Sequence, residues 1–286
     1  MIRFFRPLFC TALLFYAAPA SAAPALWKVS DADSKILLFG SVHILPSDFQ
    51  WRSERFDQAL GKVDKVMFET DVSPAAQAMV AAEAFARGVY TDGTLLTDVL
   101  DDAQEARIRA AAAEYSVPFG PLLAMRPWMA AGMISNAAMA RAGFTDIGVE
   151  GQLLPELTDK TMAYFETNMF QLDLLTGSDD KEDAGELIAA LDGMTDFPEQ
   201  IDSLLDHWVA GQSDGLLELL VEQMATDEDM IDPIIYQRNA SWIAPIEKLL
   251  ADNELTLIVV GAAHLLGDKG VPALLKAKGY TVERIE

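Results

Sequence analysis

The chain has 286 residues, of which 51% are hydrophobic, and a formal net charge of -23 at pH 7. This composition supports one large buried core and excludes disorder as the expected state. The negative charge excludes nucleic acid as an expected partner, because phosphate backbones are bound mainly through lysine and arginine.

Residues 1–22 have the pattern of a secretory signal peptide. Arg3 and Arg6 precede an apolar stretch, and the small residues Ala20 and Ala22 mark a cleavage region. A membrane-spanning helix is the weaker interpretation, because the apolar run is too short to cross a bilayer. We therefore expect a periplasmic or secreted protein with no integral membrane segment after signal removal. Loss of two arginines takes its net charge from -23 to -25.

Cys10 is the single cysteine, and it lies inside this signal. The exported chain is then without a thiol, which excludes a disulfide framework, a cysteine nucleophile and cysteine ligands to a metal. Any metal has to be held by histidine, aspartate or glutamate.

The mature chain begins with a predicted β-hairpin, in which residues 26–29 and 35–42 flank the turn-rich sequence SDADS. A short helix is expected near 53–60 and a strand over 65–70. From 74 to about 145 the composition favours helices. Pro74 opens one of them, Asp102 and Glu105 have the spacing of a capping box for the next, and a third runs from Pro127 to Gly143.

The second half of the chain alternates in the same way. A strand is expected over 161–168, ending near Glu166, and helices over 169 to about 250. The apolar run TLIVVG (256–261) predicts a fully buried strand, followed by a helix at 271–279 and a closing strand at 280–285. We predict one α/β domain over residues 23–286 with a helical insertion.

Two of the three histidines follow an apolar strand in the same pattern, G-x-x-H, as Gly40 to His43 and Gly261 to His264. Ligands of open α/β sheets gather at the carboxyl ends of the strands, where both imidazoles are expected. The alternative is that each histidine only caps its strand by a hydrogen bond to the backbone. His207 lacks this context and is expected to be an ordinary helix residue.

Glu69 is expected at the end of a third strand, either in solvent or facing the same crevice as the two histidines. Two imidazoles and a carboxylate form a workable ligand set for a divalent ion such as Zn, Mn, Co or Fe. Such an ion acidifies a bound water and polarises a carbonyl.

Arg238 and Asn239, in YQRNASW, are expected just inside a helix that begins after Pro233. Arg238 is a candidate to stabilise an oxyanion or grip a carboxylate, and the alternative is a surface ion pair. Glu150 and Glu166 are weaker candidates, as a general base or as partners that orient a ligating imidazole.

These motifs together resemble the TraB/GumN family, which is related to the Tiki proteins. The resemblance rests on LFGSVHILP, VVGAAHLLGDKGV, MFET and QRNASW, with RPWMAAGM, GVEGQL and FETNMFQLDLL as further landmarks. It implies a fold similar to the erythromycin-esterase and ChaN group, a central mixed sheet flanked by helices. At Glu150, many relatives carry Asp.

For the Tiki branch the resemblance implies a metal-dependent peptidase, typically with Mn or Co. His43 and His264 become expected metal ligands and Glu69 a ligand or base, with Arg238 and Asn239 in the active centre. The leading hypothesis is an exported metal-dependent hydrolase that uses Mn, Co or Zn and acts on a peptide or small-molecule substrate. The alternative is a protein that binds haem or a peptide without turnover, as the ChaN and pheromone-inhibitor relatives suggest.

Overall fold

A computed structural model describes residues 23–145, 147–176, 179–194, 197–224 and 231–286. The predicted signal peptide and Cys10 lie outside these ranges. The described chain is an α/β fold with a central six-stranded mixed sheet in the order β6-β4-β7-β2-β1-β8. The strands are β1 (Leu26–Ser30), β2 (Lys35–Ser41), β4 (Lys65–Phe68), β6 (Thr161–Tyr164), β7 (Thr256–Gly261) and β8 (Thr281–Arg284).

The sheet confirms the predicted fold class, and its strand directions explain where polar residues collect. β2, β7, β4 and β6 are parallel neighbours, whereas β1 runs antiparallel to both β2 and β8. The predicted hairpin is the β1–β2 pair. Because β2, β4 and β7 end at the same edge, the residues that follow them meet there.

Both faces of the sheet are covered by helices, which is why β7 is buried along its whole length. One face packs on α1 (Glu54–Leu60), α6 (Val149–Leu153) and α9 (Phe197–Val209). The other packs on α12 (Gln237–Ala251) and α13 (Val271–Ala277).

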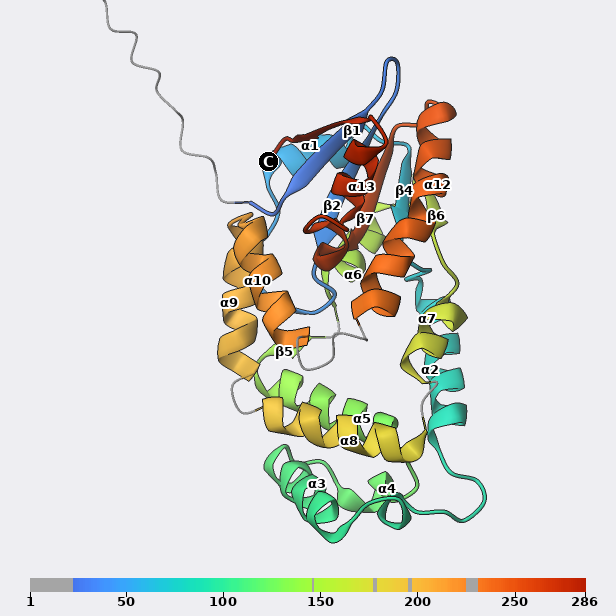
Figure 1. The fold of residues 1–286 in the computed structure, drawn as a ribbon, viewed down its shortest axis with the longest axis vertical. Helices are drawn as coiled ribbons and strands as arrows, with labels where there is room; N and C mark the ends of the chain where they lie inside the picture. Colours follow the sequence, from blue (N-terminus) through green and yellow to red (C-terminus); the bar gives the residue numbers. More distant parts are fainter. Residues whose placement is uncertain (1–22, 146, 177–178, 195–196, 225–230) are drawn as a thin grey trace, which may run out of the picture.

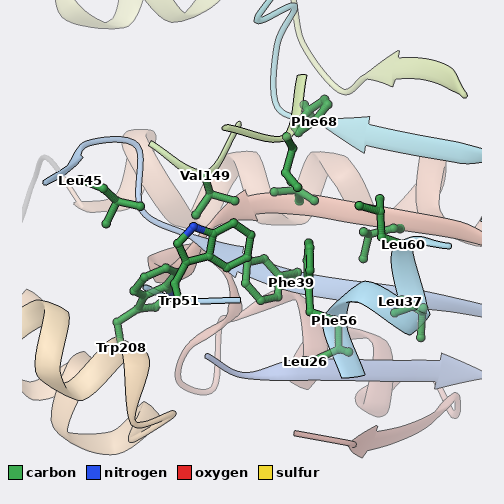
Figure 2. Packing of buried hydrophobic residues seen from close by; sticks show 14 of the residues in the cluster. Leu26, Leu37, Phe39, Leu45, Trp51, Phe56, Leu60, Phe68, Val149 and Trp208 are labelled. Atoms are coloured by element: carbon green, nitrogen blue, oxygen red, sulfur yellow. The ribbon is translucent and has the colours of Figure 1, made fainter. Parts of the chain in front are cut away.

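An aromatic cluster dominates the first of these faces. Phe39 of β2 lies with its ring centroid 4.5 Å from that of Phe56 and 5.4 Å from that of Trp51 (Figure 2). Trp208 of α9 joins the cluster, and its indole Nε1 donates to the carbonyl of Gly40, 2.8 Å away. Aromatic contacts of this kind each contribute about 0.5–1.5 kcal/mol beyond burial. The cluster therefore fixes the end of β2, where the first G-x-x-H loop begins.

The helical insertion has a core of its own, formed by α3, α4, α5 and α8. It lies at the opposite end of the molecule from β1 and α13, and α2 and α7 connect it to the sheet (Figure 1). Its helices and their neighbours are α2 (Pro74–Gly88), α3 (Asp102–Glu114), α4 (Phe119–Leu122), α5 (Pro127–Arg141), α7 (Asn168–Leu175), α8 (Asp180–Gly193) and α10 (Ser213–Met224).

Four local features differ from or add to the predictions. The capping box of α3 uses Asp101 and Gln104, one residue earlier than predicted, because Asp101 has the extended backbone of a cap and Asp102 is already helical. Residues 45–46 and 144–145 form a two-residue β pair, β3 (Leu45–Pro46) with β5 (Phe144–Thr145). A π-helical turn (Asp232–Tyr236) precedes α12. Short 3-10 turns cover Leu96–Asp98, Leu154–Glu156 and Ala262–Leu265.

In the described part of the chain, no helix is both long and apolar enough to cross a membrane.

Candidate functional site

The two G-x-x-H loops leave the sheet side by side. β2 and β7 are parallel neighbours in which Ser41 is paired with Gly261. A Cβ at Gly40 would lie 3.0 Å from the Cα of Ala262, so the first loop passes tightly over the start of the second. A side chain at Gly40 would force Ala262 to shift, so glycine suits this approach.

Glu69, directly after β4, lies between the two histidines. Its Oε1 accepts a hydrogen bond from the backbone N–H of Gly261 at 2.7 Å. The same oxygen is 3.7 Å from Nε2 of His264 and 3.9 Å from Nε2 of His43. A Cβ at Gly261 would lie only 3.1 Å from the His43 ring, so this glycine keeps the space between the groups open. The three residues predicted as metal ligands thus meet in one place.

The ring of His264 is buried and oriented by Asn239. Its Nδ1 lies 2.6 Å from Oδ1 of Asn239, whose Nδ2 donates to the carbonyl of Lys269 at 2.9 Å. This arrangement assigns the proton of His264 to Nδ1 and leaves the lone pair on Nε2, facing Glu69. Burial, helped by the positive charge of Arg238, lowers the pKa of His264 to about 4. His264 is therefore neutral at pH 7.

His43 has the opposite environment. Its Nδ1 lies 3.1 Å from Oε1 of Glu150, and its side chain is 60% exposed. Ser41 donates its hydroxyl to the same carboxylate oxygen. The negative charge of Glu150, with a smaller contribution from Glu69, raises the pKa of His43 to about 9.

Glu150 reaches His43 because α6 begins very close to the first loop. A Cβ at Gly148 would lie 2.2 Å from the carbonyl carbon of His43, and the N–H of Val149 donates to the carbonyl of Val42 at 3.0 Å. Only glycine permits this approach, which explains the glycine that opens GVEGQL. Glu150 is 8% exposed, so its carboxylate faces the site and not the solvent.

Arg238, in the first turn of α12, joins the remaining carboxylates. Its Nε donates to Glu166 at 2.9 Å, and its Nη2 donates to both Glu166 and Glu69. Nη1 donates to the carbonyl of Ile234 at 2.8 Å and lies 3.2 Å from Nε2 of His264. All five guanidinium donors therefore have protein acceptors. This geometry favours a positioning role for Arg238 over direct contact with a substrate oxyanion.

Two further side chains complete the site and were not predicted. Gln171 of α7 donates to Glu69 at 3.0 Å and to Glu166 at 3.2 Å. Trp242 donates its Nε1–H to Glu166 at 2.8 Å, and its ring centroid lies 4.4 Å from that of His264. Trp242 is four residues after Arg238, so helical spacing could have indicated it. Gln171 lies within the landmark FETNMFQLDLL, but nothing in that segment singled out its side chain.

The buried charges of this site do not balance. Glu69, Glu150 and Glu166 supply three carboxylates, and Arg238 is the one guanidinium among them. Burial opposes ionisation of Glu69, yet His264, His43, Arg238 and the Gly261 N–H together hold its pKa at about 2. At pH 7 His43 is protonated, so three carboxylates, one guanidinium and one imidazolium leave a charge of -1, which becomes -2 once His43 releases its proton. A bound cation would compensate this charge.

The nitrogen and oxygen atoms of this site are of the kind that bind a divalent cation, although they lie slightly farther apart than ligands of a bound ion. Each histidine presents Nε2 to Glu69 and has Nδ1 held by an acceptor, as metal-ligating histidines do. Ligands about 2.1 Å from a tetrahedral ion are roughly 3.4 Å apart, slightly closer than the distances found here. Among the described residues no three His, Cys, Asp or Glu side chains form a ready metal group. For Nε2 of His264 to bind an ion, Arg238 would also have to give up its contact with that nitrogen.

Comparison with known proteins agrees with the motifs. The profile described as the TraB/PrgY/gumN family matches residues 25–284. A protein described as "Metalloprotease TIKI homolog", from Amphimedon queenslandica, is 38% identical over 61 residues, which is 21% of this chain and 12% of that relative. The matched segment thus spans about an eighth of the relative's length. No solved structure matches.

Proposed function

The chain belongs to the TraB/PrgY/gumN family, and from this premise we propose that it is a metal-dependent hydrolase that cleaves peptides. The single observation that carries the proposal is the convergence of His43, His264 and Glu69 from three parallel strands. The partial similarity to a Tiki metalloprotease homologue supports the reaction class.

The proposed ligands are Nε2 of His43, Nε2 of His264 and Oε1 of Glu69, with Mn, Co or Zn as the ion. When bound, such an ion acidifies water and polarises a carbonyl. The net negative charge of the buried carboxylates supports cation binding, and so does the neutral state of His264 at pH 7.

The other residues orient these ligands. Glu150 holds the His43 ring and Asn239 holds the His264 ring, each through Nδ1. Arg238 fixes the second oxygen of Glu69 and neutralises part of the carboxylate charge. The exposed side of the site is at His43, so a substrate would approach there, whereas His264 is enclosed.

We further propose that the protein acts outside the cytoplasm. Arg3 and Arg6 with the apolar stretch after them support export, and a thiol-free chain after cleavage at residue 22 suits an oxidising compartment.

The test is metal binding and peptide cleavage by the exported form. Protein freed of metal with a chelator is titrated with Mn, Co and Zn by calorimetry and assayed on a peptide library. We expect one ion per chain, and at least about tenfold weaker binding together with lost cleavage in His43→Ala and His264→Ala. His207→Ala is the matched control, since Nδ1 of His207 lies 2.8 Å from the carbonyl oxygen of Ser203, within α9 and outside the proposed site.

The binding alternative predicts a different pattern. A haem- or peptide-sequestering protein would retain its ligand without cleaving it, and a haem complex would give a Soret band that is lost in the histidine variants. If no divalent ion is retained and cleavage is unchanged in His43→Ala, the hydrolase proposal is wrong.

A further inference from the structure

Helix α2 exposes its apolar side. Only Gly88 of its 15 residues is buried, while Met79 is 70% exposed and Phe85 is 59% exposed. One continuous face of the helix carries no polar side chain. It consists of Ala75, Ala78, Met79, Ala82, Phe85 and Ala86, all of which are exposed.

The charged residues of α2, Glu83 and Arg87, lie outside this face. Arg87 donates to Glu83 at 2.8 Å and to Asp173 of α7 at 2.5 Å. α2 therefore carries its ion pairs on the flank that meets α7, where they stay partly exposed, and its apolar side chains on the side that faces solvent. This is the reverse of the usual arrangement of a surface helix, and it marks a contact surface.

From Ala78 to Ala86 the order of side-chain sizes on this face is symmetric about Ala82. Residues equally far from Ala82 match in size: Met79 with Phe85, and Ala78 with Ala86. A two-fold axis through Ala82 would pair two antiparallel copies of α2 with Met79 of one against Phe85 of the other. The alanines at positions 78, 82 and 86 would allow a close approach of the two helices.

We propose that this face, Ala75 to Ala86, is the contact between two copies of the chain. This face has no charged side chain, which supports a second copy as the occupant. Each copy carries a net charge of -23, so two copies can approach each other closely only where their surfaces are uncharged. A membrane is the poorer occupant, because helices that lie on anionic lipid carry lysine or arginine beside the apolar face.

The size of the face predicts a reversible dimer. Fifteen helical residues extend for about 22 Å. A face of that length covers on the order of 400 Å² per partner, below the roughly 800 Å² of a stable complex. High salt should strengthen the dimer, because it screens the repulsion between two acidic chains. The inference does not depend on the proposed hydrolase activity.

Sedimentation of the mature chain over a range of concentrations and salt tests the proposal. We expect a monomer–dimer equilibrium whose dissociation constant rises at least about tenfold in Ala82→Glu, where two like charges meet at the axis. Glutamate is a good helix former, so the fold should persist. Met133→Glu, at an exposed methionine of α5, is the matched control and should leave the constant unchanged.

Cysteine cross-linking tests the axis itself, since the signal-free chain has no other thiol. Ala82→Cys should form a disulfide dimer. A mixture of Met79→Cys and Phe85→Cys should give the mixed dimer in preference to either homodimer. A monomer at every concentration and salt overturns the proposal, as does a dimer that Ala82→Glu leaves intact. Monomeric binding to zwitterionic vesicles through this face also overturns it.

Discussion

The two G-x-x-H loops share one sequence pattern and one position in the sheet, but they produce chemically different imidazoles. The His43 side chain is 60% exposed and pairs with a carboxylate, which raises its pKa to about 9. The His264 side chain is 4% exposed and pairs with an amide, and burial lowers its pKa to about 4. The motif determines where the imidazole lies, whereas the partner on Nδ1 and the degree of burial determine its charge.

This difference suits a shared ion. A neutral His264 presents its lone pair without losing a proton, whereas His43 would have to release one to bind the proposed metal. The affinity for metal should therefore rise as pH increases toward the pKa of His43. Variants can test which parts of the site maintain the difference between the two loops.

The largest expected effect is at Glu69, the group common to both loops. Glu69→Gln keeps the shape but removes the charge that both histidines and Arg238 face. We expect loss of metal binding and about 3 kcal/mol of destabilisation in urea unfolding, because a buried guanidinium loses one of its two carboxylates. Glu83→Gln, in the exposed pair with Arg87, is the control and should cost below about 0.5 kcal/mol. If Glu69→Gln also cost below about 0.5 kcal/mol, the result would contradict the buried ion pair of Glu69 with Arg238.

The next largest effect is expected at Gly148, where a substitution affects the first loop and not the second. Gly148→Ala introduces a Cβ against the backbone of His43 and does not touch the second loop. We expect about 2 kcal/mol of destabilisation from overpacking, with the NMR signals of His43 displaced and those of His264 retained.

Gly132→Ala is the matched control for this change. Nothing lies within 4 Å of a Cβ at Gly132, which is inside α5, so alanine should stabilise the chain by about 0.5–1 kcal/mol. If Gly148→Ala were equally harmless, the close approach of α6 to the first loop would be wrong.

Glu150→Gln changes the first loop alone, through the contacts of Glu150 with His43 and Ser41. The pKa of His43 should fall toward its ordinary value, because the negative charge of Glu150 is the main cause of the increase. We expect about a tenfold loss of metal affinity, measured by calorimetry, since the ring loses its carboxylate partner. Glu156→Gln, which removes a surface partner of Arg52, is the control. An unchanged titration of His43 would exclude Glu150 as its partner.

The sequence predicted the strands that position the site better than the side-chain contacts within it. The strands β2, β4 and β7 follow from apolar runs, and their common direction brings His43, Glu69 and His264 together. These are consequences of local pattern and parallel topology. The α3 cap was misplaced by one residue because Asp101 and Asp102 both offer a capping carboxylate, and only the backbone distinguishes them.

The partners of the two histidines depend on tertiary structure, so the sequence named Glu150 only as a weaker candidate to orient an imidazole and did not indicate which histidine it would contact. Glu150 contacts His43 across 107 positions of the chain, through a five-residue helix whose approach depends on Gly148. Gln171 meets Glu69 across 102 positions. Arg238 was expected in the active centre, but its complete set of protein acceptors follows from the positions of Glu166 and Ile234, which no local pattern specifies.

The smallest expected effect is in the pH dependence of stability of the metal-free protein, where the two histidines act with opposite sign. His43 binds its proton more tightly when folded, so its contribution is complete below pH 6.5 and is lost as pH rises toward 9. His264 binds its proton more weakly when folded, so stability is lost as pH falls from 6.5 toward 4. Urea unfolding at each pH should show His43→Gln flattening the alkaline side by about 1 kcal/mol, a value reduced for solvent screening at the exposed ring, and His264→Gln flattening the acidic side. If both variants changed the dependence of stability on pH in the same direction, the opposite pKa shifts of His43 and His264 would be wrong.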